Sequence, residues 1–300
     1  MGMFSYVNGR MLGAGEARVS VEDAGFQHAV GLFETMSVHH GRAFRLGAHL
    51  QRLTASAIEL GLARELDGQV LAAAVDQTIR HHQVDRARVR LTATAGNLSL
   101  LRAGASDPLT PTIVVTAQPP TEYDPAYFER GVTVLIAPAI ANPFDAMTGH
   151  KTLSYWGRLR ILRQAAAARA GEAIVLNISN HLASGTVSNV FLVKEGALLT
   201  PFAHGEEVPG ALHAPVLPGV TRAVVIELAL AAGIDVQRKM LSVDDLLSAD
   251  EVFLTNSGWQ ILPVTSVEKQ PIAGGQVGDL TKRLRQELLD LIEQETSDAS

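Results

Sequence analysis

The chain has 300 residues, 47% of them hydrophobic, which is enough for one large or two medium domains with their own cores. Its 31 acidic and 25 basic side chains give a net charge of −6 without a long run of either sign, so neither a nucleic-acid nor an anionic-membrane partner is expected. No cysteine is present, which excludes disulfides, thiolate nucleophiles and sulfur-ligated metals. The N-terminus lacks a signal-peptide pattern, and no stretch reaches the about 18 apolar residues of a membrane span, so a cytoplasmic protein is expected.

The first part of the chain mixes strand and helix patterns. Strands are expected over residues 4–7, 32–40, 42–46, 87–95 and 111–118. Apolar residues recur every three or four positions from Leu46 to Leu60, which predicts a helix ending at Gly61, and a second helix is expected over 67–82. These elements predict an α+β domain over residues 1–118.

Two consecutive prolines, Pro119 and Pro120, disfavour helix and sheet pairing and predict a linker over residues 119–125. Beyond it, strand and helix patterns alternate. Strands are expected over 131–138, 172–178 and 251–256, a hairpin over 189–201, and helices over 156–170, 221–232 and 277–295. This alternation predicts an α/β domain over residues 126–300.

Lys151 differs from the other four lysines, which lie at hairpin ends or on charged helix faces. It lies in the run GHKTLSYW, between a loop and a helix, next to apolar and aromatic residues. A lysine that forms a Schiff base needs such neighbours to keep its amine free near neutral pH. On these residues alone, an ordinary surface lysine near a helix start is the favoured interpretation.

A set of motifs in one order gives Lys151 a more specific interpretation. The motifs are VEDAGFQHAVGLFET (21–35), FRLGAHLQRLTASA (44–57), HKTLSYWGRLRILRQA (150–165), GEAIVLN (171–177), SGTVSNVFLV (184–193), LPGVTRAVVIELA (217–229) and ADEVFLTNSGWQILPV (249–264). Together they cover nearly the whole chain, which resembles the class IV aminotransferases, the fold type IV pyridoxal-phosphate enzymes that include D-amino-acid aminotransferase. The resemblance implies pyridoxal 5′-phosphate as cofactor, Lys151 as the Schiff-base lysine, and a homodimer in which a loop of one subunit completes the site of the other.

The resemblance also assigns the residues that hold the cofactor. A phosphate group needs free backbone N–H groups at a helix start and a cation. Val220 and Thr221 match the phosphate-binding turn of the family, Ser257 matches a second phosphate contact, and Arg52 matches the phosphate-binding arginine. Tyr155 matches a tyrosine that bonds the phenolic oxygen of the cofactor in branched-chain aminotransferases, although buried packing is an equal alternative.

Ser184 departs from the family pattern. The family has a glutamate here, which keeps the pyridine nitrogen of the cofactor protonated, and a serine hydroxyl cannot do so. Three interpretations remain open. Ser184 donates a hydrogen bond to the nitrogen in a natural variant, the serine was introduced into a glutamate-containing parent, or another acid or a histidine such as His181 reaches the ring.

Two further positions bear on the substrate. Phe33 replaces a tyrosine that binds substrate in D-amino-acid aminotransferases, and Arg102 follows a loop without the histidine of their Arg-x-His pair. D-amino-acid specificity is therefore not supported, and these two residues are candidate substrate contacts. The apolar cluster Leu98, Leu100 and Leu101 in the same loop fits burial in a dimer.

The resulting functional prediction is transamination between an amino acid or amine and a 2-oxo acid. The main alternative is a 4-amino-4-deoxychorismate lyase that releases pyruvate, and a weakly active or non-catalytic family member is a third possibility because of Ser184. No metal site is predicted, because the pairs His39-His40 and His81-His82 lack acidic residues at ligand spacing.

Overall fold

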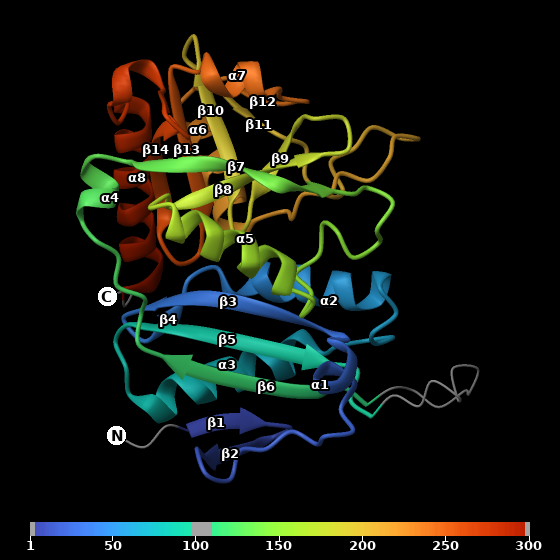
Figure 1. Cartoon of the computed structure of the whole chain (residues 1–300). Coiled ribbons are helices and arrows are strands. Elements are labelled where there is room, and N and C mark those ends of the chain that lie inside the picture. Colours follow the sequence, from blue (N-terminus) through green and yellow to red (C-terminus); the bar gives the residue numbers. More distant parts are fainter. Residues whose placement is uncertain (1–3, 98–109, 298–300) are drawn as a thin grey trace. The chain divides into compact units, whose positions relative to one another are not determined.

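The computed structural model describes residues 4–97 and 110–297 (Figure 1). Its contacts divide the chain into two compact units. Unit 1 comprises residues 1–121, Lys151–Ser154 and 292–300, and unit 2 comprises Glu122–His150 and Tyr155–Leu291. The chain first passes from one unit to the other at residues 121 and 122, within the stretch proposed as a linker.

Unit 1 is built on a six-stranded sheet in the order β2-β1-β6-β5-β3-β4. Every pair of neighbouring strands is antiparallel. The strands are β1 (Phe4–Val7), β2 (Arg10–Gly13), β3 (Gly31–His39), β4 (Arg42–Ala43), β5 (Ala87–Thr94) and β6 (Thr112–Gln118). Strand β4 is shorter than the predicted strand 42–46, because the positive φ of Arg45 (52°) ends the extended backbone and α2 begins at the next residue.

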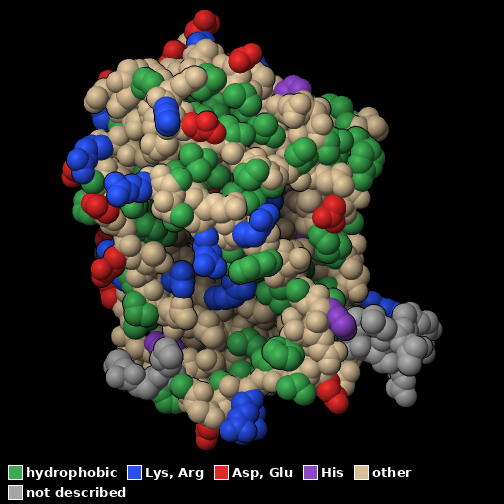
Figure 2. Space-filling view, viewed as in Figure 1, with side chains coloured by type: hydrophobic (Ala, Val, Ile, Leu, Met, Phe, Trp, Pro, Cys, Tyr) green, Lys and Arg blue, Asp and Glu red, His purple; other side chains and the backbone are tan. Residues whose placement is uncertain are grey.

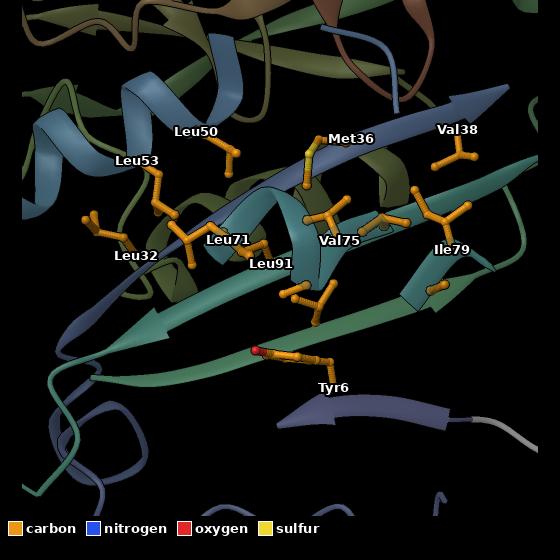
Figure 3. Close-up of a cluster of buried hydrophobic side chains, with 14 of the residues drawn as sticks. Tyr6, Leu32, Met36, Val38, Leu50, Leu53, Leu71, Val75, Ile79 and Leu91 are labelled. Atoms are coloured by element: carbon orange, nitrogen blue, oxygen red, sulfur yellow. The ribbon is translucent and has the colours of Figure 1, made fainter. Parts of the chain in front are cut away.

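Three helices accompany this sheet: α1 (Ala24–His28), α2 (Leu46–Glu59) and α3 (Gly68–His82). The predicted three-to-four spacing holds in α2, and the apolar side chains of α2 and α3 point toward the sheet (Figure 3). Leu53 of α2, Val75 of α3 and Leu91 of β5 are almost fully buried in this core. Replacing Leu53 or Leu91 by alanine would lower the free energy of unfolding by about 2–5 kcal/mol.

Unit 2 contains a nine-stranded sheet in the order β12-β11-β10-β13-β14-β7-β8-β9, with β15 paired to β14. The pairs β11–β12, β14–β7 and β7–β8 are parallel and the others are antiparallel. The strands are β7 (Val132–Ala141), β8 (Glu172–Asn177), β9 (Leu182–Gly185), β10 (Asn189–Lys194), β11 (Ala197–Thr200), β12 (Val236–Arg238), β13 (Glu251–Asn256), β14 (Gln260–Val267) and β15 (Gln270–Pro271). The predicted hairpin is formed by β10 and β11, which turn at Glu195 and Gly196 with positive φ.

The helices of the remaining chain are α4 (Ala126–Glu129), α5 (Trp156–Ala167), α6 (Val220–Ala231), α7 (Val243–Leu247) and α8 (Asp279–Thr296), with a short 3-10 turn at Ala273–Gly275. Among the described residues, no helix combines the length and apolarity needed to cross a bilayer. Acidic and basic side chains both appear over the face drawn in Figure 2, as expected from a sequence without long charge runs.

Candidate active site

The segment Lys151–Ser154 belongs to unit 1 because its backbone pairs with strand β3. The N–H of Phe33 donates to the carbonyl of Lys151 (2.9 Å), and the N–H of Leu153 donates to the carbonyl of Gly31 (2.9 Å). Leu32 and Thr152 form an isolated antiparallel bridge between these bonds. The segment thus occupies the edge of β3 that β4 does not reach, and the backbone of Lys151 is fixed by regular pairing rather than by a free loop.

The amine of Lys151 lies over an aromatic ring that also contacts a second cation. The Nζ atom is 4.5 Å from the centroid of the Phe33 ring, and the guanidinium carbon of Arg90 is 3.7 Å from the same centroid. Both distances are within the about 6 Å at which a cation is attracted to an aromatic face. Phe33 is buried, whereas Lys151 and Arg90 are half-buried. Phe33 therefore joins the predicted lysine to Arg90, which the sequence interpretation missed.

The adjacent residue, Glu34, points to the opposite face of β3 because successive side chains alternate along a strand. Its carboxylate accepts two hydrogen bonds from Arg52, at 2.8 Å from Nε and 2.5 Å from Nη2, and one from Nδ1 of His49 at 2.7 Å. Glu34 and His49 are almost fully buried, and Arg52 is 10% exposed. Arg52, the candidate phosphate-binding residue, is therefore oriented by a bidentate contact with Glu34. This contact uses two of the five N–H donors of the guanidinium.

The protonation states of this network follow from its charges. Burial would raise the pKa of the Glu34 carboxyl, but the charge of Arg52 and the hydrogen bonds from His49 and Arg52 outweigh it and lower the pKa from 4.5 to about 2. Burial lowers the pKa of His49, despite the hydrogen bond and the charge of Glu34. A neutral His49 that donates from Nδ1 presents Nε2 as an acceptor, so the network fixes the tautomer of this imidazole.

In unit 2, the candidate phosphate residues Val220 and Thr221 form the first turn of α6, whose N-cap is Gly219. Asn189 at the start of β10 positions this turn, since its Nδ2 donates to the carbonyl of Leu217 (2.9 Å). A Cβ on Gly219 would lie 2.0 Å from Oδ1 of Asn189, so only glycine allows this close approach. Asn189 was not predicted as a site residue, although it lies in the quoted motif SGTVSN.

The first turn of α6 has the properties of an anion site. No side chain among the described residues caps it by a hydrogen bond, so its N–H groups are not covered by a side-chain acceptor. Thr255 is paired with Asn189 across β13 and β10, which places both side chains on the same face of the sheet. The Thr255 hydroxyl is buried and has no hydrogen-bond partner within residues 4–97 and 110–297. An orphaned hydroxyl beside an uncapped helix start is the chemistry that a phosphate group would satisfy.

The candidate Ser257 lies in the turn that follows β13. Asn256 shapes this turn, because its Oδ1 accepts the N–H groups of Gly258 (2.8 Å) and Trp259 (3.0 Å), and its Nδ2 donates to the carbonyl of Val187 (3.2 Å). Ser257 is half-buried and lies two residues beyond Thr255. Asn256 therefore attaches this turn to Val187, two residues before Asn189, the residue that contacts the segment leading into α6.

Ser184, at the end of β9, lies next to a cation. Nη1 of Arg158, in the first turn of α5, is 3.5 Å from the Ser184 hydroxyl and donates to the carbonyls of Gly185 (3.3 Å) and Thr186 (3.1 Å). The Ser184 hydroxyl itself donates to the carbonyl of Gly185 (2.8 Å) and is buried. Position 184 therefore presents a neutral hydroxyl beside a guanidinium.

The comparisons with known proteins agree with these motifs. A family model described as amino-transferase class IV matches residues 31–267, more than three-quarters of the chain. The chain belongs to the class IV aminotransferase family. These enzymes use pyridoxal 5′-phosphate, so the family, the enzyme class and the cofactor predicted from the sequence are confirmed.

Relatives of this class IV aminotransferase include proteins with different reactions. A Methanocaldococcus jannaschii protein assigned as a branched-chain-amino-acid aminotransferase is 32% identical over 291 residues, covering 95% of each chain. A D-alanine aminotransferase from Bacillus licheniformis is 28% identical and covers 97% of each chain. The crystal structure of 4-amino-4-deoxychorismate lyase from Pseudomonas aeruginosa superimposes with a TM-score of 0.83 at 26% identity, covering 95% of this chain and 98% of that one. The predicted fold class is confirmed.

The remaining candidate residues from the sequence lie at several places in the chain. Tyr155 is the N-cap of α5 in unit 2 and is half-buried. Arg102 and the cluster Leu98, Leu100 and Leu101 lie outside the described residues. His181, one alternative partner for the pyridine ring, lies in the turn before β9, where its Nδ1 is 3.4 Å from the Ser179 hydroxyl.

An unpredicted carboxylate, Glu172, lies near Ser184 in this class IV aminotransferase. It is fully buried at the start of β8 and accepts hydrogen bonds from the N–H groups of Ala173 (2.9 Å) and Val187 (3.1 Å) and from the hydroxyls of Ser188 (3.1 Å) and Thr186. Four donors satisfy this carboxylate within the protein. Glu172 therefore stabilises the turn between β9 and β10. Nothing in the local sequence distinguishes it from other glutamates at the start of a strand.

Proposed function

We propose that this chain is an aminotransferase that moves an amino group between an amino acid or amine and a 2-oxo acid, with Lys151 as the lysine that binds the cofactor aldehyde. The observation that carries the proposal is the placement of Lys151, whose backbone is paired to β3 and whose amine lies 4.5 Å from the Phe33 ring. A catalytic amine must be held in one position beside a water-poor surface. The backbone pairing holds Lys151 in place, and the Phe33 ring supplies an apolar surface beside its amine.

The roles of the surrounding residues in unit 1 follow from their charges. Once the amino donor has displaced it from the aldehyde, the Nζ amine of Lys151 would take the proton from the substrate Cα as general base. It would then deliver that proton, as general acid, to the former aldehyde carbon of the cofactor. Arg90 contacts the same Phe33 ring and offers a planar cation that can bind a substrate carboxylate. Arg52, oriented by Glu34, supplies the cation for the cofactor phosphate. Phe33 contributes an apolar surface against which a substrate side chain can pack.

In unit 2, the start of α6 and the turn at Ser257 are proposed to hold the cofactor phosphate. Val220 and Thr221 would donate backbone N–H groups, and Ser257 would donate its hydroxyl. The orphaned Thr255 hydroxyl supports this assignment, because a buried polar group without a partner costs about 1–3 kcal/mol. Tyr155 remains a proposed contact to the phenolic oxygen of the cofactor.

When bound, the cofactor supplies an aldehyde for the amine and an aromatic ring that accepts electrons from the substrate. How strongly the ring accepts electrons depends on the group facing its nitrogen. Ser184 is proposed to face that atom, and Arg158 beside it disfavours an additional positive charge there. We therefore propose slower proton removal from substrate than a glutamate at position 184 would give.

Lyase activity on 4-amino-4-deoxychorismate is the second candidate, favoured by the similarity to the Pseudomonas aeruginosa lyase. It would use the same lysine to release pyruvate without a second substrate. A non-catalytic protein is a third candidate because of Ser184. A homodimer, with a loop of one subunit completing the site of the other, and a cytoplasmic location also remain proposals.

The deciding experiment is a panel of amino donors and 2-oxo acid acceptors, monitored by the absorbance of the bound cofactor. Branched-chain L-amino acids and D-alanine should both be included, since relatives carry out both reactions. Transamination predicts that the absorbance changes with a donor alone and is restored by a 2-oxo acid. Pyruvate release from 4-amino-4-deoxychorismate without an acceptor would favour the lyase, and a colourless protein would contradict both.

A further inference from the structure

The loop that joins β11 to α6, residues 201–219, contains a cluster of imidazoles and carboxylates. His204, Glu207 and His213 come from this loop, and His150 packs against it, all in unit 2. The ring centroids of His204 and His150 are 4.7 Å apart, and those of His204 and His213 are 5.4 Å apart. None of the roles proposed above uses this cluster.

Two glutamates give the loop its shape. Glu206 accepts two hydrogen bonds from Arg222 (2.8 and 2.7 Å) and one from Arg238 (3.0 Å), which fastens the loop to α6 and β12. Glu207 accepts the N–H groups of Ala214 (2.5 Å) and Gly205 (2.8 Å). These two backbone bonds orient the Glu207 carboxylate, whose Oε1 lies 3.8 Å from Nδ1 of His204.

The position of His204 is also restricted. A Cβ on Gly149, which has a φ of +85°, would lie 2.8 Å from the Cβ of His204, so the chain before His150 passes directly against this imidazole. The side chains of His204 and Glu207 are 15% and 13% exposed, whereas His213 is exposed. The cluster thus has two fixed members and one that is open to solvent.

The ligand atoms of His204, Glu207 and His213 all lie within 4.8 Å of one another, and Nδ1 of His204 is 3.8 Å from Oε1 of Glu207. Two ligands of one tetrahedral Zn²⁺ are about 3.3 Å apart, given metal–ligand bonds of about 2.0–2.1 Å. Side-chain rotations, mainly of the exposed His213, that shorten these separations by up to about 1.5 Å would therefore bring the three atoms to coordination distance.

We propose that His204, Glu207 and His213 form a binding site for a divalent first-row transition metal of the Zn²⁺ type. Two imidazole nitrogens and one carboxylate oxygen are a donor set suited to such ions rather than to Mg²⁺ or Ca²⁺, which prefer oxygen ligands. The exposed side of His213 leaves a path for the ion and a position for water. The loop ends at Gly219, the N-cap of α6. A bound ion would therefore stabilise the conformation of the loop between His213 and the proposed phosphate turn.

The test uses holoenzyme without a histidine tag, freed of unbound cofactor and dialysed against Zn²⁺ in phosphate-free buffer. Bound zinc is counted by atomic emission, and the site is probed with Co²⁺, whose visible absorption reports its coordination geometry in difference spectra. The wild-type chain should bind one ion, and His213→Gln should weaken binding by about tenfold or more, since even loss of a residue that only supports a ligand costs 10–100-fold. His204→Gln should do the same, and the exposed His28→Gln is the matched control that should bind as wild type.

Absence of zinc uptake by the wild-type chain, or equal uptake by His213→Gln and wild type, would overturn the proposal. Because His213 is exposed, its variant remains informative even if His204→Gln fails to fold. The measurement does not depend on transamination, so an inactive enzyme that binds zinc through these residues would still support the site.

Discussion

Replacing Glu34 by glutamine tests the buried network that orients Arg52. The amide keeps the shape of the carboxylate but carries no charge. Its NH2 group cannot accept a hydrogen bond and, in either orientation, faces at least one N–H donor of Arg52. The variant therefore leaves the Arg52 charge in a largely buried position without its counter-ion.

The expected loss can be estimated from the pKa of Glu34. A decrease from 4.5 to about 2 corresponds to about 3 kcal/mol of stability at neutral pH. Since the pKa in the folded chain is the lower one, this contribution is complete above pH 4.5 and is lost as the pH falls toward 2. Removing one partner of a buried ion pair costs about 3–5 kcal/mol in other proteins, which agrees with this estimate.

The measurement is urea unfolding of wild type and Glu34→Gln at several pH values between 7 and 3, with the exposed Glu65→Gln as control. The difference between wild type and Glu34→Gln should be about 3 kcal/mol at pH 7 and should shrink below pH 4.5. A difference under about 1 kcal/mol at pH 7, or one that does not change with pH, would refute the assigned charge state of the network.

Three further variants test the site. Arg90→Gln should raise KM for an amino-acid donor by about 10- to 100-fold, the value of a hydrogen bond to a charged group, and an unchanged KM would remove Arg90 from substrate binding. Gly219→Ala should weaken cofactor binding measured by equilibrium dialysis, because its Cβ would lie 2.0 Å from Asn189; undiminished affinity would contradict the proposed phosphate turn. Ser184→Glu should speed the half-reaction with a donor in stopped-flow absorbance, and more so when Arg158 is also changed to glutamine, since Arg158 would otherwise pair with the new carboxylate. Identical rates in all three proteins would reject the electronic role of position 184.

Much of the fold could be predicted because local patterns and tertiary structure agree. The spacing of apolar residues in α2 and α3 is satisfied by one core, and the turn at Glu195 and Gly196 joins two strands as expected. The boundaries of β4 were wrong because the positive φ of Arg45 has no sequence signal. Similarly, the pairing of Lys151–Ser154 with β3 joins residues more than 100 positions apart, which periodicity cannot reveal.

In the candidate site, too, residues within motifs could be proposed from the sequence, whereas residues brought together by the fold could not. Lys151 and the α6 turn could be proposed from the sequence because they lie in motifs. Arg90 and Glu172 were not proposed, because each resembles an ordinary strand residue. Arg90 becomes notable only because the fold brings its guanidinium and the Lys151 amine to the same Phe33 ring. Glu172 is identified by four donors that the fold brings together from the turn after β9 and from its own strand neighbour.

Reduction of the holoenzyme with borohydride, followed by mapping of the modified peptide, tests whether Lys151 binds the cofactor. We expect a single stable cofactor adduct on Lys151, absent from Lys151→Arg and retained in the exposed control Lys269→Arg. An adduct on another lysine, or the same labelling in Lys151→Arg, would contradict it.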